Sequence, residues 1–130
     1  MGFDLVGVVE RLHADLATWL GSQAPVEVFE RFAAAQHERF TMVTTGGDLL
    51  GRSELIAGLR RAGNSVPGLT IEVSDVEELL RSESAAVIRF LEAHRVAGSV
   101  TRRWVTAVLT TDDPGGVRWL AVQETEAAAD

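Results

Sequence analysis

The sequence contains no cysteine, no lysine and no tyrosine, and these three absences limit the chemistry that it can perform. Without cysteine there is no disulfide, no thiolate nucleophile and no Cys-ligated metal. Without lysine there is no Schiff base and no covalent attachment of pyridoxal phosphate. Without tyrosine no phenol can act as an acid or as an oxyanion donor. All 12 basic residues are arginines, so chemistry is left to Asp, Glu, His, Arg, Ser and Thr.

Long apolar runs and a surplus of positive charge are also missing. No stretch approaches the ~20 apolar residues of a membrane span. The net charge of −7 leaves no basic surplus to neutralise phosphates. The first residues, Met1-Gly2-Phe3-Asp4, lack the basic region of a signal peptide. We therefore expect one cytoplasmic domain, residues 1–130, that binds neither nucleic acid nor membrane.

The hydrophobic pattern places helices early in the chain and strands late. Apolar residues recur at helical spacing in three segments, which are residues 3–20, 25–35 and 54–62. Ser53 is expected to cap the third helix, and Gly63 to follow its end. Strands are expected at residues 39–44, 49–50, 69–74 (continuing to about 80), 85–95, 100–111 and 117–125. Glycine turns separate several of them, at residues 46–47, 97–98 and 112–116. Helices gathered on a mostly antiparallel sheet define an α+β fold, and a long twisted sheet has a concave face.

The register between the strands at residues 85–95 and 100–111 follows from the turn that joins them. If Ala97-Gly98 is a two-residue loop, then Glu92 faces Arg103 and Phe90 faces Val105. A slip of one residue would place every partner on the wrong face of the sheet, so the chemical match supports this register.

The following turn is longer, and its register is estimated by pairing Leu109 with Arg118. This pairing sets Arg103 opposite Glu124, so the apolar face of three strands ends in the row Glu92–Arg103–Glu124.

The row Glu92–Arg103–Glu124 has two interpretations. It can be a cross-strand charge ladder, worth ~0.5–1 kcal/mol per exposed pair. It can also form the polar end of a pocket, where Arg103 orients an anionic or carbonyl group and one carboxylate is a general base.

The three histidines give weaker signals. We expect His13 on a helix surface and His37 in a loop or packing role near the pocket mouth. His94 is expected to be exposed near its turn, with a place at the pocket rim as the alternative. Because the three have no ligand-like spacing, we expect no metal site.

Two tryptophans, Trp104 and Trp119, share the predicted reverse face of the sheet with Leu91 and Val108. If this face is exposed to solvent, these side chains form an apolar surface patch. We therefore expect a homodimer through the Trp104/Trp119 face, related by a twofold axis.

The order of these motifs resembles the nuclear transport factor 2-like superfamily, and within it the SnoaL-like branch that includes domains of unknown function. The segment 40–55 resembles the first strand, glycine turn and third-helix entry of that branch. Residues 106–109 and 116–125 resemble its closing hairpin, with a Trp in the last strand. The resemblance covers nearly the whole chain and implies a cone-shaped curved sheet, antiparallel or mixed, wrapped on about three N-terminal helices.

The same superfamily includes steroid isomerases, polyketide cyclases, dehydratases, epoxide hydrolases and members without known activity, so the fold does not decide the function. The absence of Tyr departs from the ketosteroid isomerase pattern. Gln123 stands where many relatives carry His, whereas Glu124 and Thr125 match the common pattern of the branch.

Our leading hypothesis is a dimeric domain without a cofactor that binds a small apolar molecule or one with a carboxylate or carbonyl group. Glu92, Arg103 and Glu124 form the polar end of its pocket. The apolar lining is expected to be Phe40, Met42, Leu59, Ile71, Ile88, Phe90, Val105 and Val122.

Two alternatives stay open. The first is a cofactor-independent isomerase, cyclase or hydrolase. Its base is Glu92 or Glu124, with Asp75 or His94 less favoured, and Arg103 stabilises the developing negative charge. The second is a non-catalytic interaction module whose cone is filled by side chains.

Overall fold

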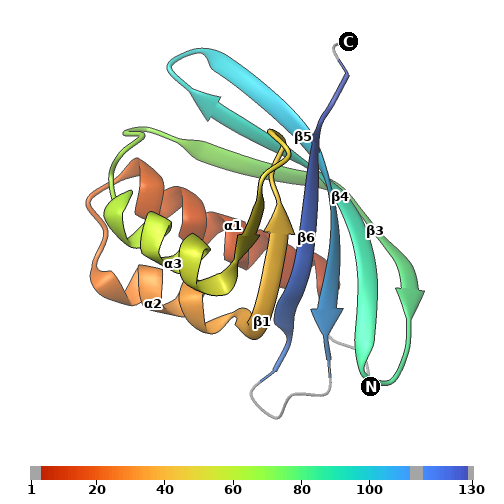
Figure 1. Ribbon diagram of the computed structural model, residues 1–130. Coiled ribbons are helices and arrows are strands. Elements are labelled where there is room, and N and C mark those ends of the chain that lie inside the picture. Colours follow the sequence, from red (N-terminus) through yellow and green to blue (C-terminus); the bar gives the residue numbers. More distant parts are fainter. Residues whose placement is uncertain (1–3, 112–115, 129–130) are drawn as a thin grey trace.

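The computed structural model describes residues 4–111 and 116–128. Phe3, where the first helix was predicted to begin, and residues 112–115 of the last predicted turn lie outside this part. The elements in chain order are α1 (Leu5–Gly21), α2 (Val26–Ala34), β1 (Gln36–Val43), β2 (Leu49–Gly51), α3 (Arg52–Arg61), β3 (Thr70–Arg81), β4 (Ala85–Val96), β5 (Ser99–Thr110) and β6 (Arg118–Glu126). The three helices lie together against one face of a single sheet (Figure 1). The predicted α+β class is confirmed.

The six strands are arranged in the order β2-β1-β6-β5-β4-β3. β1 runs parallel to β6, and the other neighbours are antiparallel, so the sheet is mixed. The last strand therefore lies between the first and the fifth, as Figure 1 shows. This arrangement brings side chains from β1, β4, β5 and β6 beneath the helices. None of the helices in the described residues is long and apolar enough to cross a membrane.

Local capping explains where two of the helices begin. The Gly7 N–H donates to Asp4 Oδ1 at 3.0 Å and caps α1. α3 begins at Arg52, and its N-cap residue is Gly51, whose N–H donates to Glu54 Oε1 at 2.9 Å. The prediction that Ser53 caps this helix is wrong, because the chain has already entered the helix one residue earlier.

The β4–β5 register is the predicted one, with Glu92 opposite Arg103 and Phe90 opposite Val105. Ala97 and Gly98 have φ angles of 50° and 81°, so both turn residues adopt the left-handed region. Positive φ at both central residues defines a type I′ turn, whose twist matches that of the flanking strands. The pairing runs without a shift from Val96–Ser99 at the turn to the far end of both strands.

The β5–β6 register differs from the prediction by one residue beside the turn, where Leu109 faces Trp119 and not Arg118, and by two residues farther along. Ala107 faces Val122 and not Leu120, and the register shifts between the Val108 and Leu109 pairs. Because Ala121 pairs with Val108 while Trp119 pairs with Leu109, Leu120 is an extra residue in β6. An extra residue of this kind is a β-bulge, and it reverses the side-chain alternation on its two sides.

Trp119 pairs with the buried Leu109 and lies in the core, where its relative exposure is 2%. Its ring packs edge-on against Phe90, with 6.2 Å between the centroids, and against His13 at 5.9 Å. The predicted pairing of Trp104 and Trp119 on the reverse face is therefore wrong. Trp104, opposite Leu91, stays on that face and is 41% exposed.

The main core lies between the concave face of the sheet and α1. Its members are buried side chains of one helix and four strands, namely Val9, Phe40, Ala86, Ile88, Phe90, Val105, Ala107, Leu109 and Trp119. Partly buried residues of α1, α3 and the strands pack around them, among them Leu12, Leu55 and Met42. This core positions the cavity described next.

Candidate functional site

A cavity of about 200 Å³ lies between the helices and the concave face of the sheet. Six of the eight apolar residues predicted for the pocket line it, which are Phe40, Met42, Leu59, Phe90, Val105 and Val122. Ile88 does not, because it is fully buried in the core beside the cavity. Ile71 does not either, because it borders a separate surface hollow near Gly21.

Much of the lining that sequence reasoning missed comes from the helices. Leu12, Leu16 and Leu20 of α1 contribute along one stripe, and Leu55 stands one turn before Leu59 on α3. Residues four apart share a helix face, so this spacing could have identified them. Phe32, Gln36 and Trp119 complete the wall.

Alternation along β4 aims Phe90, Glu92 and His94 at the same side of the sheet. Glu92 is only 2% exposed. Its Oε2 lies 3.1 Å from Nε2 of His13, and its Oε1 accepts a hydrogen bond from Nε2 of His94. Although Arg103 stands opposite in the register, no hydrogen bond or ion pair joins it to Glu92 within the described residues. The predicted register of Glu92 opposite Arg103 is thus confirmed, but the predicted charge ladder lacks an ion pair at this link. The predicted pairing of Arg103 opposite Glu124 is wrong, because Arg103 faces Glu126.

His13 is 6% exposed, and the prediction that it lies on a helix surface is wrong. Its Nδ1 donates to the Val9 carbonyl at 2.8 Å, one turn earlier in α1. A carbonyl and a carboxylate act only as acceptors. The imidazole ring therefore donates to both Val9 and Glu92 when each of its nitrogens carries a proton. His13, Glu92 and His94 thus form one hydrogen-bonded cluster, called the His–Glu–His cluster below.

The pKa of Glu92 is set by opposing effects. Burial alone would raise it, but hydrogen bonds from His13 and His94, together with their charges, outweigh burial and lower the pKa to about 2. A carboxylate with a low pKa and both oxygens occupied is a poor proton acceptor. The cluster therefore holds Glu92 in its charged form and makes it unsuited to be the base.

Arg103 and Glu124 form a second polar pair in the lining, with Arg103 Nη1 3.4 Å from Glu124 Oε1. Glu124 lies on the inward face of β6 because its cross-strand neighbour is the inward-facing Val105. Arg103 itself faces Glu126. Burial raises the pKa of Glu124, and the charge of Glu92 raises it further, against the opposing effect of Arg103. Glu124 is thus the carboxyl group of the cavity that takes up a proton most readily.

The other sequence candidates lie in different places. The His94 side chain lines the cavity with 19% exposure, which corresponds to the rim position given as its alternative. Asp75 is exposed, sits at a register shift in β3 with φ of 55°, and does not line the cavity. His37 lies in β1, where its Nδ1 accepts from the Arg39 N–H at 3.0 Å.

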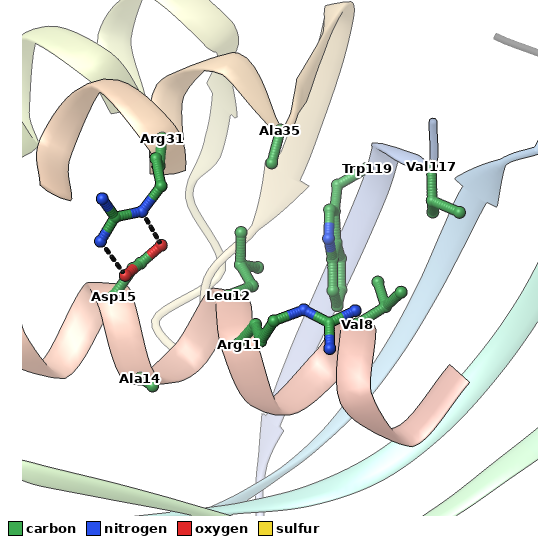
Figure 2. A pocket seen from close by; sticks show the side chains of 9 residues that line it. All are labelled: Val8, Arg11, Leu12, Ala14, Asp15, Arg31, Ala35, Val117 and Trp119. Carbon is green, nitrogen blue, oxygen red and sulfur yellow. Dashed lines mark hydrogen bonds and ion pairs between the residues drawn. The ribbon is translucent and has the colours of Figure 1, made fainter. Parts of the chain in front are cut away.

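A wider and more open hollow of about 550 Å³ lies outside this cavity, between α1, α2 and the start of β6. Figure 2 shows Arg31 and Asp15 paired across one side of it and Trp119 in its wall. Arg31 donates to Asp15 through Nη2 at 2.9 Å and Nε at 3.2 Å. We place the candidate site in the smaller cavity, because the buried ionisable groups converge there.

The described residues contain no group of three or more His, Asp or Glu side chains arranged to hold a metal ion. The five ionisable residues at the polar end instead bond to one another, in the His–Glu–His cluster and in the Arg103–Glu124 pair.

The fold defines the class: the chain has the nuclear transport factor 2-like (NTF2-like) fold, also called cystatin-like. It is similar to an NTF2-like protein of unknown function from Pseudomonas aeruginosa, with 27% identity over 95% of this chain and 98% of the other, at a TM-score of 0.90. No protein-family model and no curated protein matches the sequence. The superfamily resemblance is confirmed, and the SnoaL-like branch stays a prediction.

Two further solved structures show the same fold at lower identity. One, from Novosphingobium aromaticivorans, carries the provisional name scytalone dehydratase. It is 18% identical over 95% of this chain and 86% of its own, at a TM-score of 0.70. The other, from Thiobacillus denitrificans, is provisionally named a calcium/calmodulin-dependent protein kinase type II association domain. It is 15% identical over 77% of this chain and 82% of its own, at a TM-score of 0.64.

Proposed function

We propose that this protein binds a small, largely apolar molecule in the cavity beneath its three helices. The observation that carries the proposal is an apolar cavity of about 200 Å³ whose ionisable residues converge at one end. Pockets for drug-sized ligands occupy roughly 300–1,000 Å³, and a dry cavity of about 150 Å³ in an unrelated protein holds benzene. The occupant is therefore expected to be about the size of one substituted ring.

The pairing of the polar groups supports binding over catalysis. Both oxygens of Glu92 are occupied by histidines, and Glu124 is paired with Arg103. Such pairs orient a ligand well, and the two histidines leave Glu92 with little free basicity.

An NMR titration with toluene and acetophenone tests the proposal, because both probes match the size of the cavity. We expect saturable shift changes at Phe90, Val105 and Leu12, which line it from three elements. Val122→Phe fills the cavity and should weaken binding at least tenfold. The matched control, Val100→Phe, lies at an exposed position of β5 and should bind like the wild type. Equal binding by both variants would refute the proposal.

A second candidate function is a cofactor-independent isomerase, cyclase or hydrolase, favoured by the raised pKa of Glu124 beside Arg103. Glu124 would be the general base, and Arg103 would stabilise the developing negative charge. The test is exchange of the methyl protons of acetophenone in D₂O: the base removes one proton, and a deuteron from solvent replaces it. Catalysis requires faster exchange with the wild type and loss of that rate in Glu124→Gln.

We also propose that the protein forms a homodimer through the sheet face that carries Trp104. The support is its 41% exposure and its position opposite Leu91, on the face turned away from the helices. Trp119 is no longer part of this surface. If no ligand enters the cavity, this face is the working surface of the interaction-module alternative.

A further inference from the structure

The polar end of the cavity holds two carboxylates and one guanidinium group, and they are engaged to different degrees. Glu92 is the acceptor in the His–Glu–His cluster, and both of its oxygens are occupied. Glu124 contacts Arg103 through Oε1. What remains for a ligand is chiefly the guanidinium group of Arg103, which carries five N–H donors.

The contact between Arg103 and Glu124 is long for a charged hydrogen bond. Arg103 Nη1 lies 3.4 Å from Glu124 Oε1, whereas charge-assisted N–H···O bonds measure about 2.7–2.9 Å. No other hydrogen bond of Arg103 is present within residues 4–111 and 116–128. A guanidinium with one long contact retains the geometry to bind a carboxylate through two parallel hydrogen bonds.

The polar end of the cavity is partly exposed to solvent. The Arg103 side chain is 23% exposed and that of His94 19%, while Phe90 and Val105 beside them are buried. A molecule with one charged end and one apolar end therefore fits in a single orientation, with its charge toward Arg103.

We propose that the occupant is a small apolar carboxylic acid, bound as its carboxylate by Arg103 while Glu124 takes up a proton. The inference rests on the proposed function, because it names the ligand class of the same cavity. It excludes neutral hydrocarbons and alcohols as the preferred ligands.

Charge balance requires the proton. A bound carboxylate would be the second anion beside Arg103, and like charges in one site raise the pKa of one member. Glu124 is the group that responds, since burial and Glu92 already raise its pKa. Glu92 does not respond, because its two histidines lower its pKa to about 2. The charged and titratable groups that face Glu124 are thus Glu92 and His94 from β4 and Arg103 from β5, with His13 of α1 behind Glu92.

Calorimetric titration near pH 7 with benzoate and benzyl alcohol separates this inference from the proposed function, because the two probes share a ring. Repeating the benzoate titration in buffers of different ionisation enthalpy measures the protons taken up. We expect benzoate to bind at least tenfold more tightly than benzyl alcohol, with uptake approaching one proton. Lowering the pH toward 5.5 should tighten benzoate binding and leave benzyl alcohol unchanged.

Three variants sharpen the test. Arg103→Gln should weaken benzoate at least tenfold and leave benzyl alcohol binding unchanged, which also shows that the cavity is intact. Glu124→Gln should keep benzoate binding and abolish the proton uptake. The control, Arg95→Gln, removes an exposed arginine of β4 and should change neither.

Each contrary outcome has a distinct meaning. If benzyl alcohol binds and benzoate does not, the inference fails while the proposed function stands. If benzoate binds without proton uptake, Glu124 has no role and the inference fails in that part. If neither probe binds to the wild type, the inference fails, and the titration with toluene and acetophenone decides the proposed function.

Discussion

The Nε2 atom of His13 lies 3.1 Å from Oε2 of Glu92, so a buried imidazole of α1 contacts a buried carboxylate of β4. This contact ties the first helix to the middle of the sheet. It also borders the cavity, because both side chains belong to its lining. The same cluster therefore joins helix to sheet and borders the proposed binding site.

Glu92→Gln is expected to lower the free energy of unfolding by about 3 kcal/mol near pH 7. The pKa of Glu92 falls from 4.5 in the unfolded chain to about 2 in the folded protein, and each pKa unit corresponds to about 1.4 kcal/mol. Because the folded pKa is the lower one, this stability is fully present above pH 4.5 and is lost as the pH falls toward 2. Urea unfolding measured between pH 7 and 3 should show the two proteins converge.

The matched control for that variant is Glu77→Gln. Glu77 pairs with Arg89 at 2.9 Å, but its side chain is 60% exposed. Exposed pairs contribute about 0.2–1 kcal/mol, so the control should be close to the wild type. A Glu92→Gln variant as stable as this control would refute the buried cluster.

His13 and Glu92 should be energetically coupled. His13→Leu leaves Glu92 with His94 as its hydrogen-bond partner, and breaking a buried charged pair costs roughly 3–5 kcal/mol. Glu92→Leu should be costly for the same reason. The double variant His13→Leu/Glu92→Leu removes both polar groups, so its loss should be at least about 1 kcal/mol smaller than the sum of the two single losses. Additive losses would show that the contact contributes nothing.

The sequence was informative wherever a short turn controls the pairing. The two left-handed residues Ala97 and Gly98 allow a single hairpin geometry, and the β4–β5 register follows from them. The β5–β6 turn is longer, and Leu120 forms a bulge that no local pattern announces. The register is already one residue off beside the turn, which puts Trp119 opposite Leu109, and the bulge adds the second residue.

The site was harder to predict than the fold, because its polar groups come from elements far apart in the chain. Strand alternation alone placed Glu92, Arg103 and Glu124 on one face. It could not show that His13, a helix residue, contacts the carboxylate of Glu92. One signal was present: His13 lies four residues after Val9, on the stripe that α1 buries.

The two tryptophans of the sheet should behave differently. Trp119→Ala removes a side chain that is 2% exposed and should lower stability by about 3–5 kcal/mol. Trp104→Ala, at a position 41% exposed, should cost about 1 kcal/mol or less in a monomer. Thermal and urea unfolding of the two variants measure this contrast. Equal losses would contradict the inward position of Trp119.

The proposed dimer makes a separate prediction for Trp104→Glu. A charge placed in an apolar interface is costly, so light scattering should give twice the chain mass for the wild type and the single mass for the variant. Gln23→Glu, an exposed position between α1 and α2, is the control for added charge and should remain dimeric. A wild type that stays monomeric at high concentration would remove the interface.

The most direct test of the ligand-binding cavity is a crystal structure after soaking with bromobenzene, since the anomalous signal of bromine locates the probe. We predict one strong peak inside the cavity, in contact with Phe90, Val105 and Val122. Bromine peaks confined to the Trp104 face or to the open hollow beside Arg31, with side chains filling the cavity, would contradict a ligand-binding function.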